Sequence, residues 1–236
     1  MTEDEARGWI QQRFDVSRET WHRLEAYVEI LREEMGNQNL IAESTRDHIW
    51  GRHIVDSAQL LPLVPPATDG AIWVDLGAGA GLPGIVVAIL SDYHVAMIEM
   101  RKLRVAFLEN VIERLGLTNA SVIGGKVERA EIGIDQATRA SVISARAYAP
   151  MERLIPSALH LADFSTIWLL PKGQNYKNEL DIAQTLWHSD VQVEQSVTAP
   201  DSAILILKQV RGRQAGSSKV ARHDPHRNRQ SKRRRR

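Results

Sequence analysis

The sequence predicts a doubly wound α/β fold with a mostly parallel, seven-stranded sheet, and three observations support this. Short apolar runs suited to strands alternate with helix-like segments from residue 71 onward, which is typical of a parallel sheet with helices on both faces. A glycine-rich turn at residues 77–84 joins the first strand to the helix after it. Only a short turn, residues 199–202, separates the last two strands. We therefore expect them to pair as a hairpin, with the last strand antiparallel.

Residues 1–66 are predicted to form a helical extension that packs on the core domain. Ser17 is suited to be an N-cap, and the apolar residues after it repeat at helical spacing: Trp21, Leu24, Val28, Leu31 and Met35. A second helix is expected from about Ser44 to Leu63, where prolines close it.

The next elements follow in order from residue 67 to residue 210, which we predict to be one α/β domain. The expected strands cover residues 71–75, 93–99, 119–123, 141–145, 165–170, 190–197 and 203–209. The expected helices cover residues 82–91, 101–115, about 126–132, 151–162 and 175–187.

The composition excludes several classes of protein. The chain has 236 residues and no cysteine, which excludes disulfides, cysteine-ligated zinc, iron–sulfur clusters and a cysteine nucleophile. No apolar run is long enough to span a bilayer, and the acidic N-terminus is unlike a signal peptide. The histidines show no metal-ligand spacing. We therefore expect a cytoplasmic protein without a membrane or metal partner.

Residues 211–236 are predicted to be a basic, disordered tail. From Lys208 to the C-terminus there are 12 Lys and Arg but a single acid, Asp224. Since the whole chain has a net charge of +1, the remainder is acidic. The tail lacks apolar periodicity and cannot build a packed core.

The glycine turn has the pattern of a cofactor-binding loop. Asp75 ends the first strand and is followed by Gly77 and Gly79, while Glu99 ends the second strand. A carboxylate at that second position can accept both hydroxyls of a ribose. An acid beside the loop suits the ammonium group of S-adenosylmethionine but would repel a pyrophosphate, so the pattern favours S-adenosylmethionine over NAD. The alternative is a tight structural turn with an exposed acid.

Two further segments follow strands at the same edge of the sheet. Lys126-Val127-Glu128 comes after the third strand, where main-chain groups can bond adenine and Val127 can pack on its ring; a plain helix start is equally compatible. Arg146 ends the fourth strand, at the reacting centre of such sheets. It would orient the cofactor carboxylate or a substrate phosphate, or else form a structural ion pair.

These residues resemble the bacterial 16S (small-subunit) rRNA guanine-N7 methyltransferase family, also called glucose-inhibited division protein B. The resemblance covers about residues 20–209 and rests on these segments: Asn39-Leu40, Arg52–Ser57, Asp75–Gly84, Arg101-Lys102, Arg104–Leu108, Ser144–Ala147 and Leu170–Gly173. It implies a class I S-adenosylmethionine methyltransferase domain at residues 67–210. It also implies a methyl-donor site at Gly77, Leu82, Glu99, Val127, Glu128 and Arg146. From the loop pattern described above, we add Asp75 and Gly79 to this site. Many members have different tails, so the basic tail falls outside the resemblance.

The expected acceptor is N7 of one guanine in 16S rRNA, free or in a small ribosomal subunit precursor. That nitrogen carries a lone pair at neutral pH, so no general base is needed, and Arg146 and Lys172 are predicted to position the reactants. We expect His53 to bond near the cofactor cleft or to hold the N-terminal helices to the domain.

Cationic side chains are predicted to bind RNA phosphates. The candidates lie at the helix start after the second strand and in the tail: Arg101, Lys102, Arg104, Arg211, Arg213 and Arg233. A monomer is expected. Two other functions stay open at this point, an NAD-dependent oxidoreductase and a non-catalytic RNA-binding module on the same fold.

Overall fold

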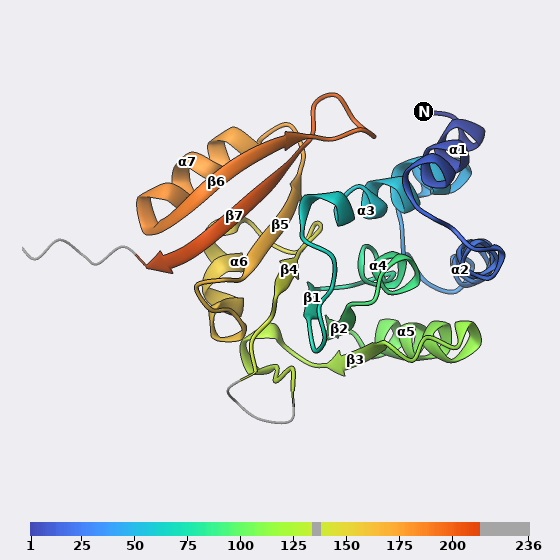
Figure 1. The fold of residues 1–236 in the computed structure, drawn as a ribbon, viewed down its shortest axis with the longest axis horizontal. Helices are drawn as coiled ribbons and strands as arrows, with labels where there is room; N and C mark the ends of the chain where they lie inside the picture. Colours follow the sequence, from blue (N-terminus) through green and yellow to red (C-terminus); the bar gives the residue numbers. More distant parts are fainter. Residues whose placement is uncertain (134–137, 213–236) are drawn as a thin grey trace, which may run out of the picture.

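The computed structural model describes residues 1–133 and 138–212, and it places seven strands in one sheet (Figure 1). The strands are β1 (Ile72–Leu76), β2 (His94–Glu99), β3 (Ala120–Gly124), β4 (Val142–Ser144), β5 (Ile167–Lys172), β6 (Trp187–Gln195) and β7 (Ala203–Gly212). The α-helices are α1 (Glu3–Arg13), α2 (Arg18–Glu34), α3 (Asp56–Ala58), α4 (Gly84–Leu90), α5 (Lys102–Leu115), α6 (Met151–Ala158) and α7 (Tyr176–Leu186). Every expected strand is present, within three residues at each end.

The strand order is β3-β2-β1-β4-β5-β7-β6. The four pairs among the first five of these strands are parallel, and β7 runs antiparallel to both β5 and β6. The order reverses direction between β1 and β4, which is where doubly wound sheets bind ligands. The prediction of a mostly parallel sheet with an antiparallel last strand is confirmed.

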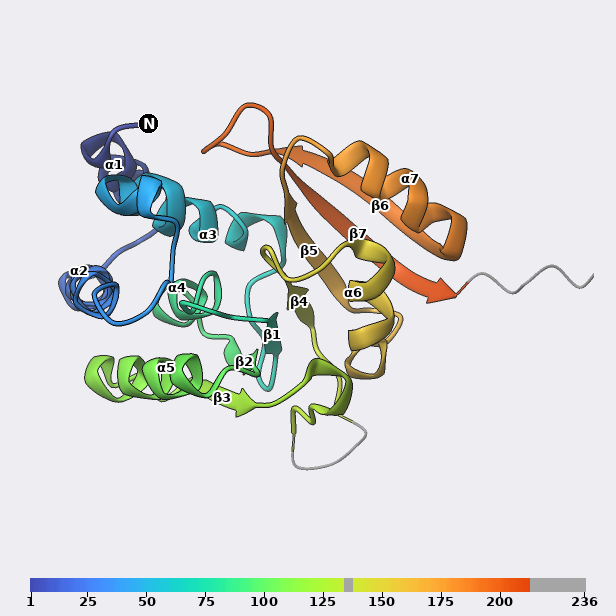
Figure 2. The same ribbon diagram turned by 180° about the vertical axis from the view of Figure 1, so that it is seen from behind.

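Helices cover both faces of the sheet (Figures 1 and 2). Alternate side chains of β1 face opposite ways, so that Trp73 joins the core with α1, α2, α4 and α5, whereas Val74 joins the core with α6 and α7. Residues of β4 and β5 divide between the same two cores. The short β1 and α4 are buried along almost their whole length, which holds the turn between them on a rigid base.

The N-terminal helices share one continuous core with the sheet. Ser17 caps α2 as expected, because its hydroxyl accepts a hydrogen bond from the Thr20 amide. Tyr27 of α2 is fully buried, and its hydroxyl donates to the Ala80 carbonyl at 2.8 Å. The extension thereby touches the glycine turn directly.

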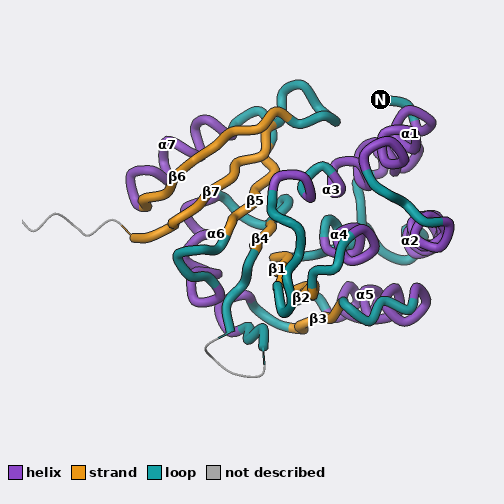
Figure 3. Tube along the Cα trace, viewed as in Figure 1, coloured by secondary structure: helices purple, strands orange, loops and turns teal. Residues whose placement is uncertain are grey.

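The second expected helix, from Ser44 to Leu63, is broken into short pieces (Figure 3). Residues 43–48 form a 3₁₀ helix and residues 50–55 form a π-helix before α3 begins. The carboxylate of Glu3 accepts from the amides of Trp50 and Gly51, each at 3.2 Å. Glu3 thereby satisfies two backbone donors in the first turn of the π-helix, where the winding changes from that of the 3₁₀ helix.

The helix expected at about 126–132 is also shorter than predicted. Only Val127–Arg129 is helical, as one 3₁₀ turn that the Ala130 amide closes on the Val127 carbonyl. Val127 and Ala130 are both buried, and their three-residue spacing places them on one side of a 3₁₀ turn.

Candidate functional site

The turn after β1 takes a conformation that only glycine adopts without strain. Gly77, Gly79 and Gly81 have φ angles of 65°, 59° and 86°, in the left-handed region. The amides of Gly77 and Ala78 both donate to the Ile98 carbonyl on β2, at 2.8 and 3.1 Å. These bonds hold the turn close to the end of β2.

Glu99 ends β2 and organises the same turn. One carboxylate oxygen accepts from the Gly79 amide at 3.0 Å, and the other accepts from the Arg101 amide at 2.8 Å. The Arg104 guanidinium lies 3.9 Å from the first oxygen. A carboxylate has about four lone-pair sites, so Glu99 can hold the loop and still accept hydrogen bonds from a ligand.

Two cavities lie side by side at the carboxyl edge of the sheet. The smaller, of about 420 Å³, lies between the glycine turn and the ends of β2 and β3. Its lining includes the following residues: Gly77, Glu99, Arg101, Arg104, Lys126, Val127 and Glu128. The larger, of about 540 Å³, lies over the ends of β4 and β5. Ala147 and Tyr148 line both cavities, so they form the boundary between them.

Three expected cofactor residues do not line either cavity. Asp75 is 1% exposed, and its carboxylate accepts from the Gly84 amide at 3.0 Å and the Ser144 hydroxyl at 2.9 Å. Burial raises its pKa to about 7, although these two hydrogen bonds oppose the shift. These two hydrogen bonds tie the loop to β4. Gly79 acts through its amide, and Leu82 is buried in the core.

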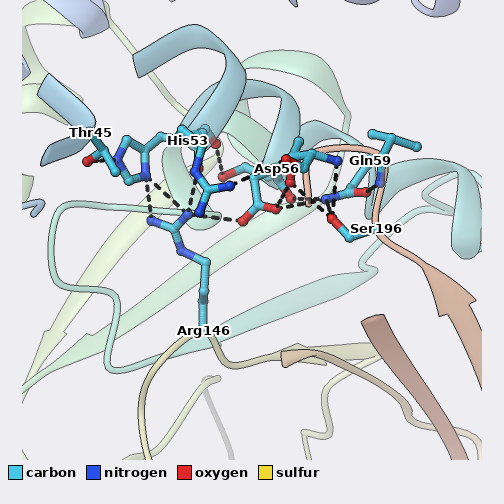
Figure 4. Close-up of polar contacts among 10 residues, drawn as sticks. Thr45, His53, Asp56, Gln59, Arg146 and Ser196 are labelled. Atoms are coloured by element: carbon cyan, nitrogen blue, oxygen red, sulfur yellow. Dashed lines mark hydrogen bonds and ion pairs between the residues drawn. The ribbon is translucent and has the colours of Figure 1, made fainter. Parts of the chain in front are cut away.

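Arg146 lies in the larger cavity and forms an ion pair (Figure 4). Its guanidinium is 3.1 Å from the Asp56 carboxylate, and both terminal nitrogens lie 3.2 Å from Nδ1 of His53. The structure thus shows the ion pair that was one of the two interpretations of Arg146. The side chain does not line the smaller cavity, and it ties the end of β4 to the segment before α3.

His53 is held on both sides of its ring. Nε2 lies 2.8 Å from the Thr45 hydroxyl, while Nδ1 faces Arg146. Burial, together with the positive charges of Arg146 and Arg52, lowers the pKa of His53 to about 3. The imidazole is therefore neutral near pH 7, and its Nδ1 lone pair faces the guanidinium.

This depressed pKa predicts a pH-dependent stability. The unfolded chain protonates His53 below about pH 6.5, whereas the folded protein resists protonation until about pH 3. The free energy of unfolding should therefore fall as the pH falls from about 6.5, by up to about 1.4 kcal/mol per pH unit from this group. Urea unfolding of wild type and His53→Gln between pH 5 and pH 7.5 measures the difference. His94→Gln, at an exposed position, is the control, and parallel profiles for wild type and His53→Gln would contradict the assignment.

The turn between β6 and β7 closes one side of the larger cavity. The Thr198 hydroxyl donates to the second oxygen of Asp56 at 2.7 Å. The Val197 amide donates to the Gln59 side chain at 2.9 Å, and Arg52 donates to the Thr198 carbonyl at 3.3 Å. Sequence reasoning missed Gln59, Thr198 and Tyr148, because no local motif marks partners that meet from distant segments.

Lys172 also lines the larger cavity, at the end of β5. Its ammonium donates to the Glu179 carboxylate of α7 at 2.7 Å and to the Ala149 carbonyl at 3.2 Å. Its side chain is only 11% exposed. Both expected positioning residues, Arg146 and Lys172, therefore lie in the same cavity.

The expected RNA-binding cations divide into three groups. Arg101 and Lys102 are exposed at the start of α5, beside the smaller cavity, and Arg211 is exposed at the end of β7. Arg104 is partly buried, and its guanidinium donates to the Asn39 carbonyl at 3.0 Å in addition to its approach to Glu99. Arg213 and Arg233 lie outside the described residues.

Neither a metal centre nor a membrane span is found in the described part of the chain. Across residues 1–133 and 138–212, no group of three or more metal-ligating side chains is arranged to hold a metal ion. In those same residues, none of the helices has both the length and the apolar character that crossing a membrane requires.

Comparison with known proteins gives consistent matches. The family model of rRNA small subunit methyltransferase G matches residues 20–205. The ribosomal RNA small subunit methyltransferase G of Zymomonas mobilis is 44% identical over 216 residues, which cover 89% of this chain and 95% of that protein. The protein of the same name from Rhizorhabdus wittichii is 44% identical over 218 residues, covering 92% and 97%.

Solved structures support the fold. The glycopeptide N-methyltransferase MtfA superposes with a TM-score of 0.54 at 8% identity, covering 65% of this chain and 89% of MtfA. The complex of MtNAS with MTA and tNA superposes with a TM-score of 0.52 at 17% identity, covering 78% and 70%. At these identities the likeness concerns the fold alone.

Proposed function

The chain belongs to the rRNA small subunit methyltransferase G family, and from this premise we propose that it transfers a methyl group from S-adenosylmethionine to N7 of a guanine in 16S rRNA. The observation that carries the proposal is the pair of adjoining cavities, whose common wall is Ala147 and Tyr148. A methyl transfer needs a donor and an acceptor in two neighbouring sites with a short path between them. The family gives no support to an oxidoreductase or to a non-catalytic RNA-binding module.

The smaller cavity fits the methyl donor. Its volume of about 420 Å³ lies in the range of roughly 300–1,000 Å³ that ligand pockets occupy. Glu99 can accept from the ribose hydroxyls, Val127 can pack on the adenine, and Gly77 lines the side of the cavity formed by the glycine turn. Glu128 lies in the first turn after Lys126, beside the adenine position. When bound, S-adenosylmethionine supplies an electrophilic methyl group.

The larger cavity fits a nucleotide acceptor. Arg52, Arg146 and Lys172 line this cavity together with Asp56 and Glu179, which pair with Arg146 and Lys172 and hold them in place. The three cations outnumber the two carboxylates, which suits a phosphate or a base edge. His53 is neutral and is bonded at both nitrogens, so it is not free to act as a base. Guanine N7 needs none, because it has no proton to lose. The protein's contribution is therefore alignment of the acceptor with the donor.

The proposed function is tested by two measurements. Calorimetry should show binding of S-adenosylmethionine and none of NAD; binding of NAD alone would overturn the proposal. N7-methylguanine should then be mapped in 16S rRNA by reduction and cleavage, in cells with and without this protein. Loss of one mapped site, restored by the intact gene, is the expected result, and an unchanged map would exclude the proposed substrate.

The RNA substrate is proposed to contact cations around the donor cavity and in the tail. Arg101 and Lys102 are exposed beside that cavity, where they can meet the phosphates that flank the acceptor. An rRNA or ribosomal-particle substrate is consistent with the expected cytoplasmic location, and a monomer stays our prediction. Strand β7 extends through Gly212, two residues into the predicted tail. The rest of the tail, residues 213–236, adds ten Lys and Arg against one Asp.

Removing residues 213–236 should weaken binding to the small ribosomal subunit and flatten its salt dependence. The slope of log K against log salt is negative, and each phosphate contact that is lost reduces its magnitude by roughly 0.7–0.9. Affinity for S-adenosylmethionine should be unchanged, which serves as the internal control. Filter binding over a series of salt concentrations measures the slope; equal slopes for both proteins would rule out a role for the tail.

A further inference from the structure

Tyr148 lies in the wall between the two cavities, and its surroundings point to a more specific role than that of a boundary. It lines the donor cavity and the acceptor cavity, and it follows the end of β4, where the strand order reverses. Among the described residues that line either cavity, it alone carries a six-membered aromatic ring. A group placed in the larger cavity next to the donor must therefore lie near this ring.

Ala147, the residue before Tyr148, has a strained backbone conformation that determines where the Tyr148 side chain lies. Ala147 has a φ of 54°, which is uncommon for a residue with a side chain and costs of order 1–3 kcal/mol. Such strain persists only where the surrounding structure enforces it. Here the left-handed residue turns the chain after Arg146, so that Tyr148 reaches back over the glycine turn.

The ring packs directly on the glycine turn. A Cβ atom built on Gly77 would lie 2.6 Å from Cδ2 of Tyr148, so the ring occupies the space that any other residue at position 77 would need. The hydroxyl is only weakly held, at 3.5 Å from the Ser157 hydroxyl of α6, which is the limit of a hydrogen bond. The aromatic ring, rather than the hydroxyl, is therefore the part of Tyr148 fixed by its surroundings.

We infer that Tyr148 is a positioning residue on which the acceptor purine stacks, so that the ring aligns the base with the methyl group across the boundary of the two cavities. This inference rests on the function proposed above. A purine offers a large flat face, and stacking on an aromatic side chain is worth about 1–3 kcal/mol per base. The other aromatic ring that lines the larger cavity, that of His53, already bonds to Thr45 and Arg146.

The test compares Tyr148→Phe with Tyr148→Leu. Phe keeps the ring and loses only the weak bond to Ser157, so we expect wild-type methylation. Leu keeps an apolar side chain but cannot stack, and should slow single-turnover methylation of small ribosomal subunits by about 5- to 150-fold, the equivalent of the stacking free energy. The subunits should come from cells that lack the methyltransferase, with S-adenosylmethionine saturating.

Further readouts separate stacking from a structural role. The affinity of Tyr148→Leu for S-adenosylmethionine should fall by a smaller factor than its methylation rate does. Its melting temperature should stay close to that of wild type. If Tyr148→Leu methylates as fast as wild type, or if its slower rate is explained by weaker cofactor binding alone, the inference is wrong. Failure of wild type to methylate the subunits would instead overturn the proposed function, so the two outcomes are distinguishable.

Discussion

Replacing Glu99 with Gln is expected to weaken S-adenosylmethionine binding by roughly 10- to 150-fold, since hydrogen bonds to a charged group contribute about 1.5–3 kcal/mol each. Both carboxylate oxygens accept from backbone amides, those of Gly79 and Arg101. An amide side chain presents an NH₂ group in place of one oxygen, so it faces one of these N–H donors with another donor. The loop amides and the ribose hydroxyls then compete for a single oxygen.

The control for Glu99→Gln is Glu109→Gln on α5. Glu109 is exposed and lies outside both cavities, and the change in charge is the same. Titration calorimetry with S-adenosylmethionine measures both variants, and circular dichroism reports whether each is folded. A Glu99→Gln protein that is folded and binds with wild-type affinity would show that the donor does not contact this carboxylate.

Much of the fold follows from local sequence signals. The strands are short apolar runs bounded by turn residues, and Ser17 caps α2 because its hydroxyl reaches an amide three residues away. The position of Glu99 is likewise readable from the sequence, because Glu99 ends an apolar run that predicts a strand. In a parallel sheet the end of that strand lies beside the glycine turn that follows β1. Signals of this kind depend on residues close in the chain, and they are readable without knowledge of tertiary contacts.

The site depended on contacts that no local signal contains. Arg146 meets Asp56 from 90 residues away, and Thr198 meets the same carboxylate from 142 residues away. The sequence also does not show which way the Asp75 side chain points. In the structure Asp75 lies opposite Ser144 across the β1–β4 pair, and its carboxylate accepts a hydrogen bond from the Ser144 hydroxyl. An acid at a strand end can serve the interior or the ligand, and only the neighbouring strand decides which.

Replacing a glycine of the glycine turn should destabilise the fold for two separable reasons, its positive φ angle and the crowding around its Cα atom. A Cβ on Gly81 would lie 2.5 Å from Cγ1 of Ile85 and 2.9 Å from Cδ2 of Leu108, and the φ of Gly81 is 86°. Gly70 has a similar φ of 73°, but a Cβ added there would meet no other atom within 4 Å. The two glycines therefore share a left-handed backbone conformation and differ in crowding.

Gly70→Ala should accordingly lower the free energy of unfolding by about 1–2 kcal/mol, the cost of a left-handed residue. Gly81→Ala should lose that amount and about 1–3 kcal/mol more from overpacking between α4 and α5. With a native stability of about 5–15 kcal/mol, the second loss removes a large part of the total. Urea unfolding of the two variants measures the difference, and equal losses would show that the packing around Gly81 relaxes to admit a methyl group, leaving φ as the reason for this glycine.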